Sequence, residues 1–337
     1  MSTSEPTPRR GGRIGVRDVA QLAGVSTQTV SRVLNNSTSL REETRARVLE
    51  AMIELDYRPN NAARALGTAT TRTLGVVATD VTLYGPALAV AALAAAARDA
   101  GRWIAAAYAD ATDELSVQSA LSHVLGQGVD GIVLVAPHAR TRDALLDHAS
   151  GTPMVVMHGG PVDRQAEGTS LVVDHLVSLG HRRIGRLGGP ADWLEELSRR
   201  SGYEAALAAQ GLAPGPSWVG DWSAEAGHRL TEQVVEAVRS PNGPTAVVVA
   251  NDQMALGLMA GLRARGVDVP GQLSVVGFDD NPDAAYYSPP LTTVSIDVTA
   301  EARRCVAQVF GHETPDEGAA PRLVARSSTA TAVQSPA

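Results

Sequence analysis

The residues with the clearest capacity for chemistry lie on a short helix predicted near the N-terminus. Thr27, Gln28 and Arg32 fall on the side of this helix opposite Val30 and Val33, which form its apolar stripe. Glutamine pairs bidentately with adenine, arginine pairs with guanine, and threonine can contact a thymine methyl group. These side chains therefore predict base readout in the major groove of DNA. An ordinary three-helix bundle with a solvated polar face is the structural alternative.

Hydroxyl and amide side chains around the same helix suit the phosphate backbone. Ser26 precedes the helix, where it can also act as an N-cap, and Ser31 and Asn35 lie farther along. A helix that starts at Val16 and a turn at Gly24 come before it, so the pair has the form of a helix-turn-helix. A third helix completes the predicted bundle.

A second group of polar residues lies in the body of the chain. Asn251 and Asp279 each follow a predicted buried strand directly. Ligands of parallel α/β sheets bind at the carboxyl ends of the strands, so both residues are expected on one lip of a binding site. Arg199, early on a predicted helix, and Trp222 complete the set. Its polar members suit the hydroxyls of a sugar, and the indole suits the sugar's C–H face.

Each of these residues also has a purely structural interpretation. Asn251 can be the N-cap of the helix predicted over 252–265, and Asp279 can cap a turn. Trp222 can be a core residue. The sequence leaves these alternatives open.

Buried strands alternate with amphipathic stretches from residue 72 onward, which predicts parallel sheets with helices on both faces. Strands are expected over 74–79, 103–108, 131–135, 154–157, 183–187, 246–250, 273–278, 291–296 and 323–326. Helices are expected over 86–100, 113–126, 169–180, 194–210, 224–238, 252–265 and 298–310. This is too many strands for one sheet of usual width, so two similar subdomains are predicted. The fold class is α/β, with a small helical head.

Composition excludes several classes of protein. The chain has 337 residues, a formal net charge of −7 and one cysteine, Cys305, so an internal disulfide is impossible. Residues 1–67 carry +3 (10 Arg against 7 acids) and residues 68–337 carry −10 (19 Arg against 29 acids), as expected of a polyanion-binding head on an acidic body. Neither a membrane-spanning stretch nor a secretory signal is found, which predicts a cytoplasmic protein. We expect no metal site, no cofactor and no enzymatic activity, because neither ligand spacing nor a nucleophile–base arrangement is present.

The literal sequence of the head carries a resemblance. The run Val16-Arg-Asp-Val-Ala-Gln-Leu-Ala-Gly-Val-Ser-Thr-Gln-Thr-Val-Ser-Arg-Val-Leu-Asn35 closely resembles the DNA-binding head of the lactose-repressor (LacI/GalR) family. Thr44-Arg-Ala-Arg-Val48 and Leu55-Asp-Tyr-Arg-Pro-Asn60 match as well. The resemblance extends from Val16 to about Thr329, nearly the whole chain.

The resemblance implies a hinge helix over residues 60–67 that forms on operator DNA and enters the minor groove. Asn60 would contact the DNA there, and Leu66 would wedge between base steps and kink the duplex. As the alternative, Leu66 is a linker residue that packs on the body. The implied organisation is a disordered arm (1–15), a helix-turn-helix domain (16–59), the hinge (60–67), an effector-binding and dimerisation core (68–329) and a disordered tail (330–337).

The resemblance also makes the core a pair of periplasmic-binding-protein-like subdomains with the effector between them. Arg199, Trp222, Asn251 and Asp279 match positions around a bound galactoside in the family, and Leu83 and Pro86 match contacts from the first subdomain. Two positions depart from galactoside-binding members, since His158 replaces an aspartate and Ile296 a glutamine. About seven residues, usually a strand, are missing between His158 and Thr169. The identity of the sugar therefore stays open.

We therefore predict a homodimeric transcriptional repressor whose affinity for a pseudo-palindromic operator is controlled by a small, galactoside-like sugar. A dimer is expected because two hinge helices must act together. No counterpart of the family's tetramerising leucine tail follows Thr329. A purine-sensing or coregulator-dependent regulator is the alternative within the family. A sugar-binding transport protein is more distant, because the head and the missing signal sequence argue against it.

Overall fold

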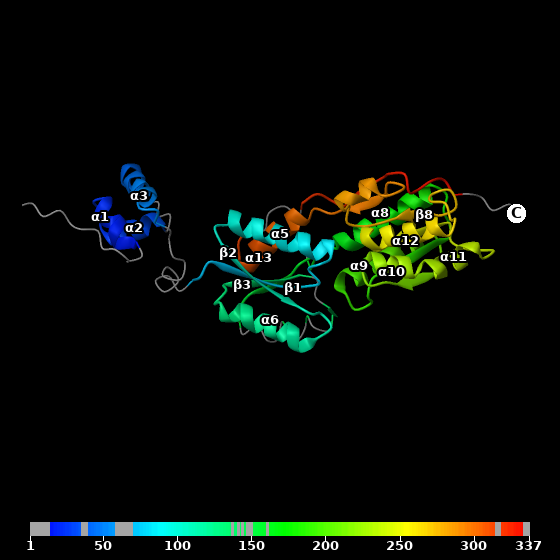
Figure 1. Ribbon diagram of the computed structural model, residues 1–337, viewed down its shortest axis with the longest axis horizontal. Helices are drawn as coiled ribbons and strands as arrows, with labels where there is room; N and C mark the ends of the chain where they lie inside the picture. The colour runs from blue at the N-terminus through cyan, green and yellow to red at the C-terminus, as the bar shows by residue number, and fades with distance from the viewer. Residues whose placement is uncertain are drawn as a thin grey trace, which may run out of the picture. The chain divides into compact units, whose positions relative to one another are not determined.

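The chain folds into two compact units, residues 1–71 and 72–337, which are described separately. The computed structural model describes residues 14–34, 40–57, 70–135, 138–139, 142, 145, 151–159, 162–313 and 318–332. Asn35, Asn60 and Leu66, and with them the predicted hinge, lie outside the described residues. The helical and α/β parts expected from the sequence are both present (Figure 1).

The first unit is a three-helix bundle of α1 (Val16–Leu22), α2 (Thr27–Leu34) and α3 (Glu42–Glu54). Gly24 joins α1 to α2 with φ +64°, a backbone conformation that a glycine adopts without a steric penalty. Val19, Val30, Val33 and Val48 are at most 3% exposed and form the centre of the core. The predicted helix-turn-helix is therefore held by the apolar stripe that the sequence showed.

The second unit contains two parallel sheets. The N-subdomain sheet has the strand order β2-β1-β3-β4, and every pairing is parallel. Its strands are β1 (Thr73–Thr79), β2 (Trp103–Ala109), β3 (Gly131–Val135) and β4 (Met154–Val156). Helices α5 (Tyr84–Asp99) and α13 (Val298–Val309) cover one face, and α6 (Glu114–Gly126) covers the other (Figure 1). β1 and β3 are almost fully buried, as expected of central parallel strands.

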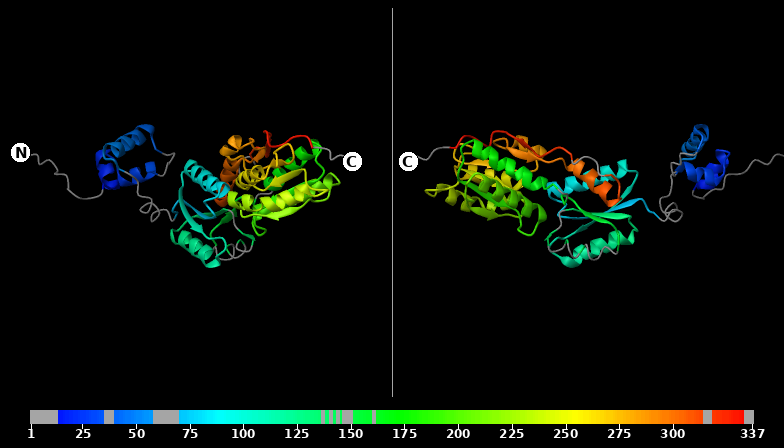
Figure 2. Two further views of the ribbon diagram at one scale, coloured as in Figure 1. Left: turned by 45° about the vertical axis from the view of Figure 1, so that its right-hand side comes forward. Right: turned by 180° about the vertical axis from the view of Figure 1, so that it is seen from behind.

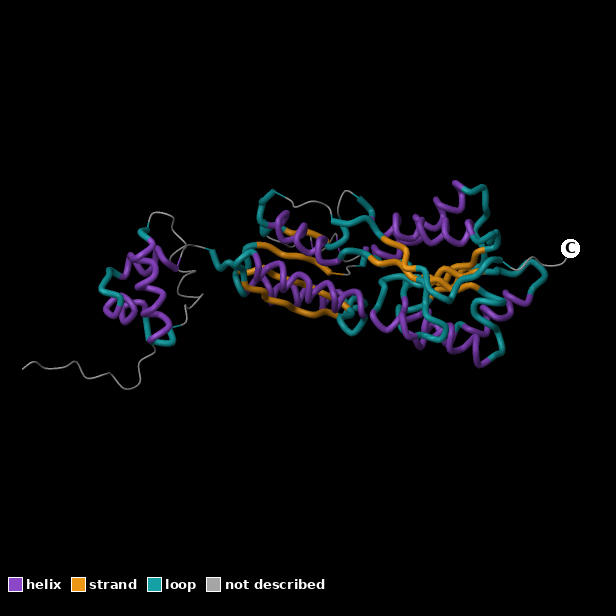
Figure 3. The backbone as a smooth tube through the Cα atoms, turned by 90° about the horizontal axis from the view of Figure 1, so that it is seen from above, coloured by secondary structure: helices purple, strands orange, loops and turns teal. Residues whose placement is uncertain are grey.

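The C-subdomain repeats this plan with the strand order β6-β5-β7-β8. Its strands are β5 (Ile184–Gly188), β6 (Ser217–Val219), β7 (Ala246–Val249) and β8 (Ser274–Val276). Its helices are α8 (Arg164–Ser178), α9 (Leu194–Ala209), α10 (Ala224–Arg229), α11 (Thr231–Arg239) and α12 (Asp252–Ala264). The strands lie between two helical layers (Figure 3). A 3₁₀ helix, η1 (Pro282–Tyr286), and an antiparallel pair, β9 (Thr293–Ser295) and β10 (Arg322–Val324), complete it.

The chain crosses between the subdomains more than once. α13, from the C-terminal quarter of the sequence, packs beside α5 of the N-subdomain, and β10 then returns to the C-subdomain (Figure 2). The two subdomains are therefore interleaved in sequence.

Several element bounds differ from the sequence expectation. α8 begins at Arg164 instead of Thr169, because Asp163 accepts hydrogen bonds from the backbone of Gln165 and Ala166 as an N-cap. The helix expected over 224–238 is divided at Leu230 into α10 and α11, and the short edge strand β6 was not expected.

Residues 330–332, the start of the expected disordered tail, are hydrogen-bonded to the core. Ala330 accepts a hydrogen bond from His181 Nε2, at 3.0 Å, and Ala332 donates to the Leu179 carbonyl, at 2.9 Å. The expectation of disorder from residue 330 was therefore wrong for residues 330–332. In the described part of the chain, every helix is too short or too polar to span a membrane.

Candidate DNA-reading face and effector cleft

The predicted DNA-reading residues form an exposed face of the head. Ser26, Thr27, Gln28, Ser31 and Arg32 are all exposed. Ser26 Oγ accepts a hydrogen bond from the backbone of Thr29, at 3.1 Å, and so caps α2 as expected. An exposed polar helix face with Gln, Thr and Arg can enter a major groove and reach base edges.

The six predicted effector residues share one pocket of the second unit, which lies between the subdomains. They are Leu83, Pro86, Arg199, Trp222, Asn251 and Asp279. Leu83 and Pro86 come from the start of α5 in the N-subdomain, and the other four come from the C-subdomain. We call this pocket the effector cleft. Its remaining lining includes Tyr84, Leu88, Val135, His158, Gln165, Trp193, Glu195, Ile296 and Val298.

Arg199 is the cationic centre of the effector cleft and is 8% exposed. Its Nη2 donates to Asp279 Oδ1 at 3.0 Å, its Nε donates to Gln165 Oε1 at 2.8 Å, and its Nη1 donates to the carbonyl of Ala250. The guanidinium also lies 4.0 Å from the centroid of the Phe278 ring. These contacts fix the orientation of the planar guanidinium group, so its remaining N–H groups are preorganised for a ligand.

Asp279 faces two opposing electrostatic effects. Burial raises the pKa of its carboxyl group above the ordinary value, while the charge and hydrogen bond of Arg199 lower it. Its backbone φ is +105°, a region that L-residues rarely occupy, and its backbone N–H donates to the Val294 carbonyl at 2.9 Å. A strained residue at a sheet edge is typical of a functional position.

Asn251 has the structural role that the sequence offered as an alternative. It is the N-cap of α12: its Oδ1 accepts from the backbone of Met254 at 2.9 Å, and its Nδ2 donates to the Trp222 carbonyl at 2.9 Å. It is 4% exposed. Asn251 therefore positions Trp222 more than it offers free hydrogen-bonding groups to the cleft.

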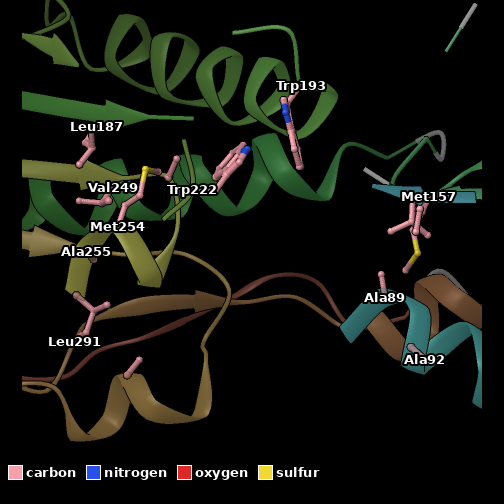
Figure 4. Packing of buried hydrophobic residues seen from close by; sticks show 14 of the residues in the cluster. Ala89, Ala92, Met157, Leu187, Trp193, Trp222, Val249, Met254, Ala255 and Leu291 are labelled. Carbon is pink, nitrogen blue, oxygen red and sulfur yellow. The ribbon is translucent and has the colours of Figure 1, made fainter. Parts of the chain in front are cut away.

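Trp222 is 5% exposed and lines the effector cleft. Figure 4 shows its indole ring among the buried hydrophobic residues. Its φ is +70°, and a Cβ atom added to Gly189 would lie 2.3 Å from the indole. The absence of a side chain at position 189 thus makes room for the ring. Within the described residues, its Nε1 is buried without a hydrogen-bond partner, an exception that calls for an explanation.

A second tryptophan, which the sequence analysis missed, lies beside the first. The rings of Trp193 and Trp222 have centroids 5.4 Å apart and an interplanar angle of 56° (Figure 4). His138, from the N-subdomain, lies 5.2 Å from Trp193, and its Nδ1 is 3.0 Å from Asp192 Oδ2. This contact and a 3.1 Å hydrogen bond from the Tyr84 backbone to Gln253 join the two subdomains beside the cleft. The only sequence signal for Trp193 was its place just before α9.

Two adjacent glutamates at the start of α9 have opposite surroundings. Glu196 is 3% exposed, pairs with Arg186 and accepts from the backbone of Gly189 at 2.9 Å, so it supports the loop after β5. Glu195 lines the cleft, and its Oε2 is buried without a partner among the described residues. Burial raises the pKa of Glu195 to about 7, against a lowering by Arg199.

The two departures from the family pattern also line the cleft. Ile296 contributes an apolar side chain to the cleft lining. Burial lowers the pKa of His158 to about 4, so this imidazole is neutral at pH 7. Gln165, which the sequence analysis missed, occupies the shortened segment on α8 and hydrogen-bonds Arg199. In the described ranges, clusters of three or more metal-ligating side chains are absent.

A helix-turn-helix head joined to two parallel α/β subdomains that enclose a polar, aromatic cleft defines a DNA-binding regulator with a ligand-sensing core. Residues 16–60 match the model of bacterial regulatory proteins of the lacI family, and residues 173–329 match a periplasmic binding protein-like domain.

Known regulators of the same family are similar to this chain over most of its length. The lactose operon repressor of Escherichia coli (strain K12) is 35% identical over 83% of this chain and 79% of its own length. A repressor named PurR from Actinobacillus pleuropneumoniae serotype 3 is 33% identical over 83% of this chain and 85% of its length. A crystal structure of the lac repressor dimer bound to operator and the anti-inducer ONPF matches with a TM-score of 0.79 and 32% identity, covering 95% of this chain and all of that one. The chain belongs to the lacI family: it is a DNA-binding repressor, not an enzyme.

Proposed function

We propose that this repressor is a homodimer whose operator affinity is lowered by a small sugar bound in the effector cleft. The observation that carries the proposal is the Arg199–Asp279 pair beside the buried indole of Trp222, at the junction of the two subdomains. A charged fork, a carboxylate and an indole face are what a sugar's hydroxyls and C–H surface require.

The proposed DNA contacts lie on the head and the hinge. Gln28 and Arg32 would read base edges with Thr27, and the phosphate contacts would come from Ser26, Ser31 and Asn35. Asn60 and Leu66 of the hinge would act in the minor groove. The lac repressor bound to operator is a dimer, which supports paired heads on a pseudo-palindromic site.

The two units would be coupled through the relative position of the subdomains. Leu83 and Pro86 on one side of the cleft, and Arg199 and Asp279 on the other, would contact one ligand together. A ligand can shift an equilibrium only by its different affinity for the two states. We infer that the sugar favours a subdomain arrangement in which paired hinges no longer support operator binding. The coupling is reciprocal, so operator must weaken the sugar's binding by the same factor.

A purine is the second candidate effector. Trp193 and Trp222 present two neighbouring aromatic rings, which also suit a planar base. Galactosides, glucosides and nucleobases should therefore be screened by thermal shift on the full chain. A ligand at 100 times its dissociation constant stabilises the folded state by about 2.7 kcal/mol. Each hit should then be tested for operator release. A nucleobase hit without a sugar hit would replace the sugar proposal.

A further inference from the structure

The effector cleft contains two buried polar atoms whose hydrogen-bonding capacity is unused within the described structure. One is the acceptor Oε2 of Glu195, and the other is the donor Nε1 of Trp222. Trp222 is 5% exposed, so its N–H is almost completely withdrawn from water. Buried groups of this kind are destabilising unless a partner arrives. Both atoms belong to residues that line the same cleft, which is where a ligand would bind.

Glu195 has no structural task comparable to that of its neighbour. Glu196 holds Arg186 and the Gly189 backbone, whereas Glu195 is partly buried against the cleft. Consecutive helical residues are rotated by about 100°, so these two carboxylates face different surroundings. The position of Glu195 in the first turn of α9 favours its ionised form through the helix dipole, but burial works against it.

The charges around Glu195 do not suit an anion. Among the described lining residues, Arg199 is the one permanent cation, and it is already paired with Asp279. His158 is neutral at pH 7, since its pKa is lowered to about 4. An ionised Glu195 thus gives this lining a net charge of −1. An incoming phosphate or carboxylate would meet this charge in a partly desolvated site, where repulsion is strong.

We propose that Glu195 is a specificity-determining residue that selects an uncharged polyhydroxy effector and excludes its phosphorylated analogues. A ligand hydroxyl donates to the Glu195 carboxylate once that side chain turns into the cleft, and the indole of Trp222 contacts the ligand from the same lining. This inference rests on the proposed sugar response and adds the chemical class of the sugar.

Ligand affinity should depend on pH if Glu195 takes part in binding. Besides burial, three groups act on the pKa of Glu195: its own backbone N–H and Arg199 of the same helix lower it, and Asp279 after β8 raises it. A hydroxyl donates to the carboxylate form, so binding should strengthen as Glu195 loses its proton. With a pKa of about 7, the ionised fraction and hence the apparent affinity rise about tenfold from pH 6 to pH 8.

The experiment uses the full-length chain and three proteins: wild type, Glu195→Gln and Glu204→Gln. Glu204 lies on the same helix, is exposed and pairs with Arg200, so its variant is a matched control for the lost charge. Calorimetry at pH 6, 7 and 8 measures binding of lactose, methyl β-galactoside, cellobiose, glucose, glucose 6-phosphate, galactose 6-phosphate and hypoxanthine. Thermal melting and operator binding establish that each variant is folded.

We expect at least one neutral sugar to bind wild type, with every phosphorylated sugar at least about thirtyfold weaker. Glu195→Gln should weaken the neutral sugar about ten- to a hundredfold, reduce the discrimination against phosphate and abolish the pH dependence, while Glu204→Gln behaves as wild type. Equal binding of a phosphorylated sugar, or identical behaviour of the two variants, would overturn the Glu195 inference alone. If none of the neutral sugars binds, the sugar response itself is wrong and the inference falls with it.

Discussion

The side-chain Nδ2 of Asn251 donates a 2.9 Å hydrogen bond to the backbone carbonyl of Trp222 and holds that residue at φ +70°. The same side chain caps α12 through its Oδ1. One asparagine therefore links the start of a core helix to the indole of the effector cleft. Cleft geometry and local stability are coupled at this residue.

Replacement of Asn251 can separate these two roles. Asn251→Ala removes both the cap and the bond to Trp222, so it should lower the free energy of unfolding by about 1–3 kcal/mol. Asn251→Ser retains a good capping group but cannot donate to the Trp222 carbonyl in the same way. It should lose less stability, yet still weaken effector binding severalfold. Urea denaturation and calorimetry measure the two effects, and wild-type effector affinity in Asn251→Ser would contradict the positioning role.

The Arg199–Asp279 pair should be essential for induction. Arg199→Ala leaves Asp279 without its cation in a mostly buried site, where 17% of the Asp279 side chain is exposed. We expect a loss of about 3 kcal/mol of unfolding free energy, near the lower end for a broken buried pair. Asp279→Asn is milder, because Arg199 keeps its bonds to Gln165 and the Ala250 carbonyl.

Both variants should still bind operator, because neither residue belongs to the head, but the sugar should no longer release them. Fluorescence anisotropy with labelled operator, with and without the effector identified by screening, tests this at a temperature where both variants are folded. Normal release of both would exclude the proposed site.

The exposed face of α2 should determine sequence specificity. Gln28→Ala and Arg32→Ala should each lose about 1–3 kcal/mol of discrimination at one base pair, with little effect on non-specific binding. Arg47→Ala on α3 is the matched control, since Arg47 is also exposed but lies outside α2. Binding to a set of operators with single base-pair changes gives the readout. Equal behaviour of Arg32→Ala and Arg47→Ala would contradict base readout by Arg32.

The buried carboxyl of Asp252 should make stability fall as pH rises. Burial, and secondarily the charge of Asp279, raise its pKa to about 8. Its Oδ1 accepts from the Thr293 hydroxyl at 2.6 Å and its Oδ2 from the Asn281 backbone at 2.7 Å. These accepted bonds lower the pKa, but burial outweighs them, so the folded state prefers the protonated form. This contribution is fully present below the unfolded-state pKa near 4 and is lost as pH rises toward 8.

Asp252→Asn imitates the protonated acid and should remove this slope. Relative to wild type, the variant should gain unfolding free energy steadily between pH 4 and pH 8, on top of a constant offset, because its amide nitrogen cannot accept one of the two hydrogen bonds. Denaturant titrations across this range provide the measurement. A constant difference between the two proteins at every pH would show that Asp252 does not titrate as inferred.

Much of the organisation could be predicted from local sequence. Val30 and Val33 recur at helical spacing, so the opposite face with Gln28 and Arg32 had to be exposed, as the structure confirms. The buried strands could also be predicted, since central strands of parallel sheets are apolar along their whole length. Asn251 and Asp279 could be placed on one lip because β7 and β8 are parallel neighbours.

Other features depended on tertiary packing. Nothing local distinguishes Glu195 from Glu196, because both are acidic residues in the first turn of one helix. The difference arises from where α9 packs. Glu196 pairs with Arg186 of β5, whereas Glu195 lines the effector cleft. Gln165 reaches Arg199 across 34 positions of sequence for the same reason. Sequence patterns fix the periodic burial of each element, whereas side-chain partners from different elements are set by how those elements pack.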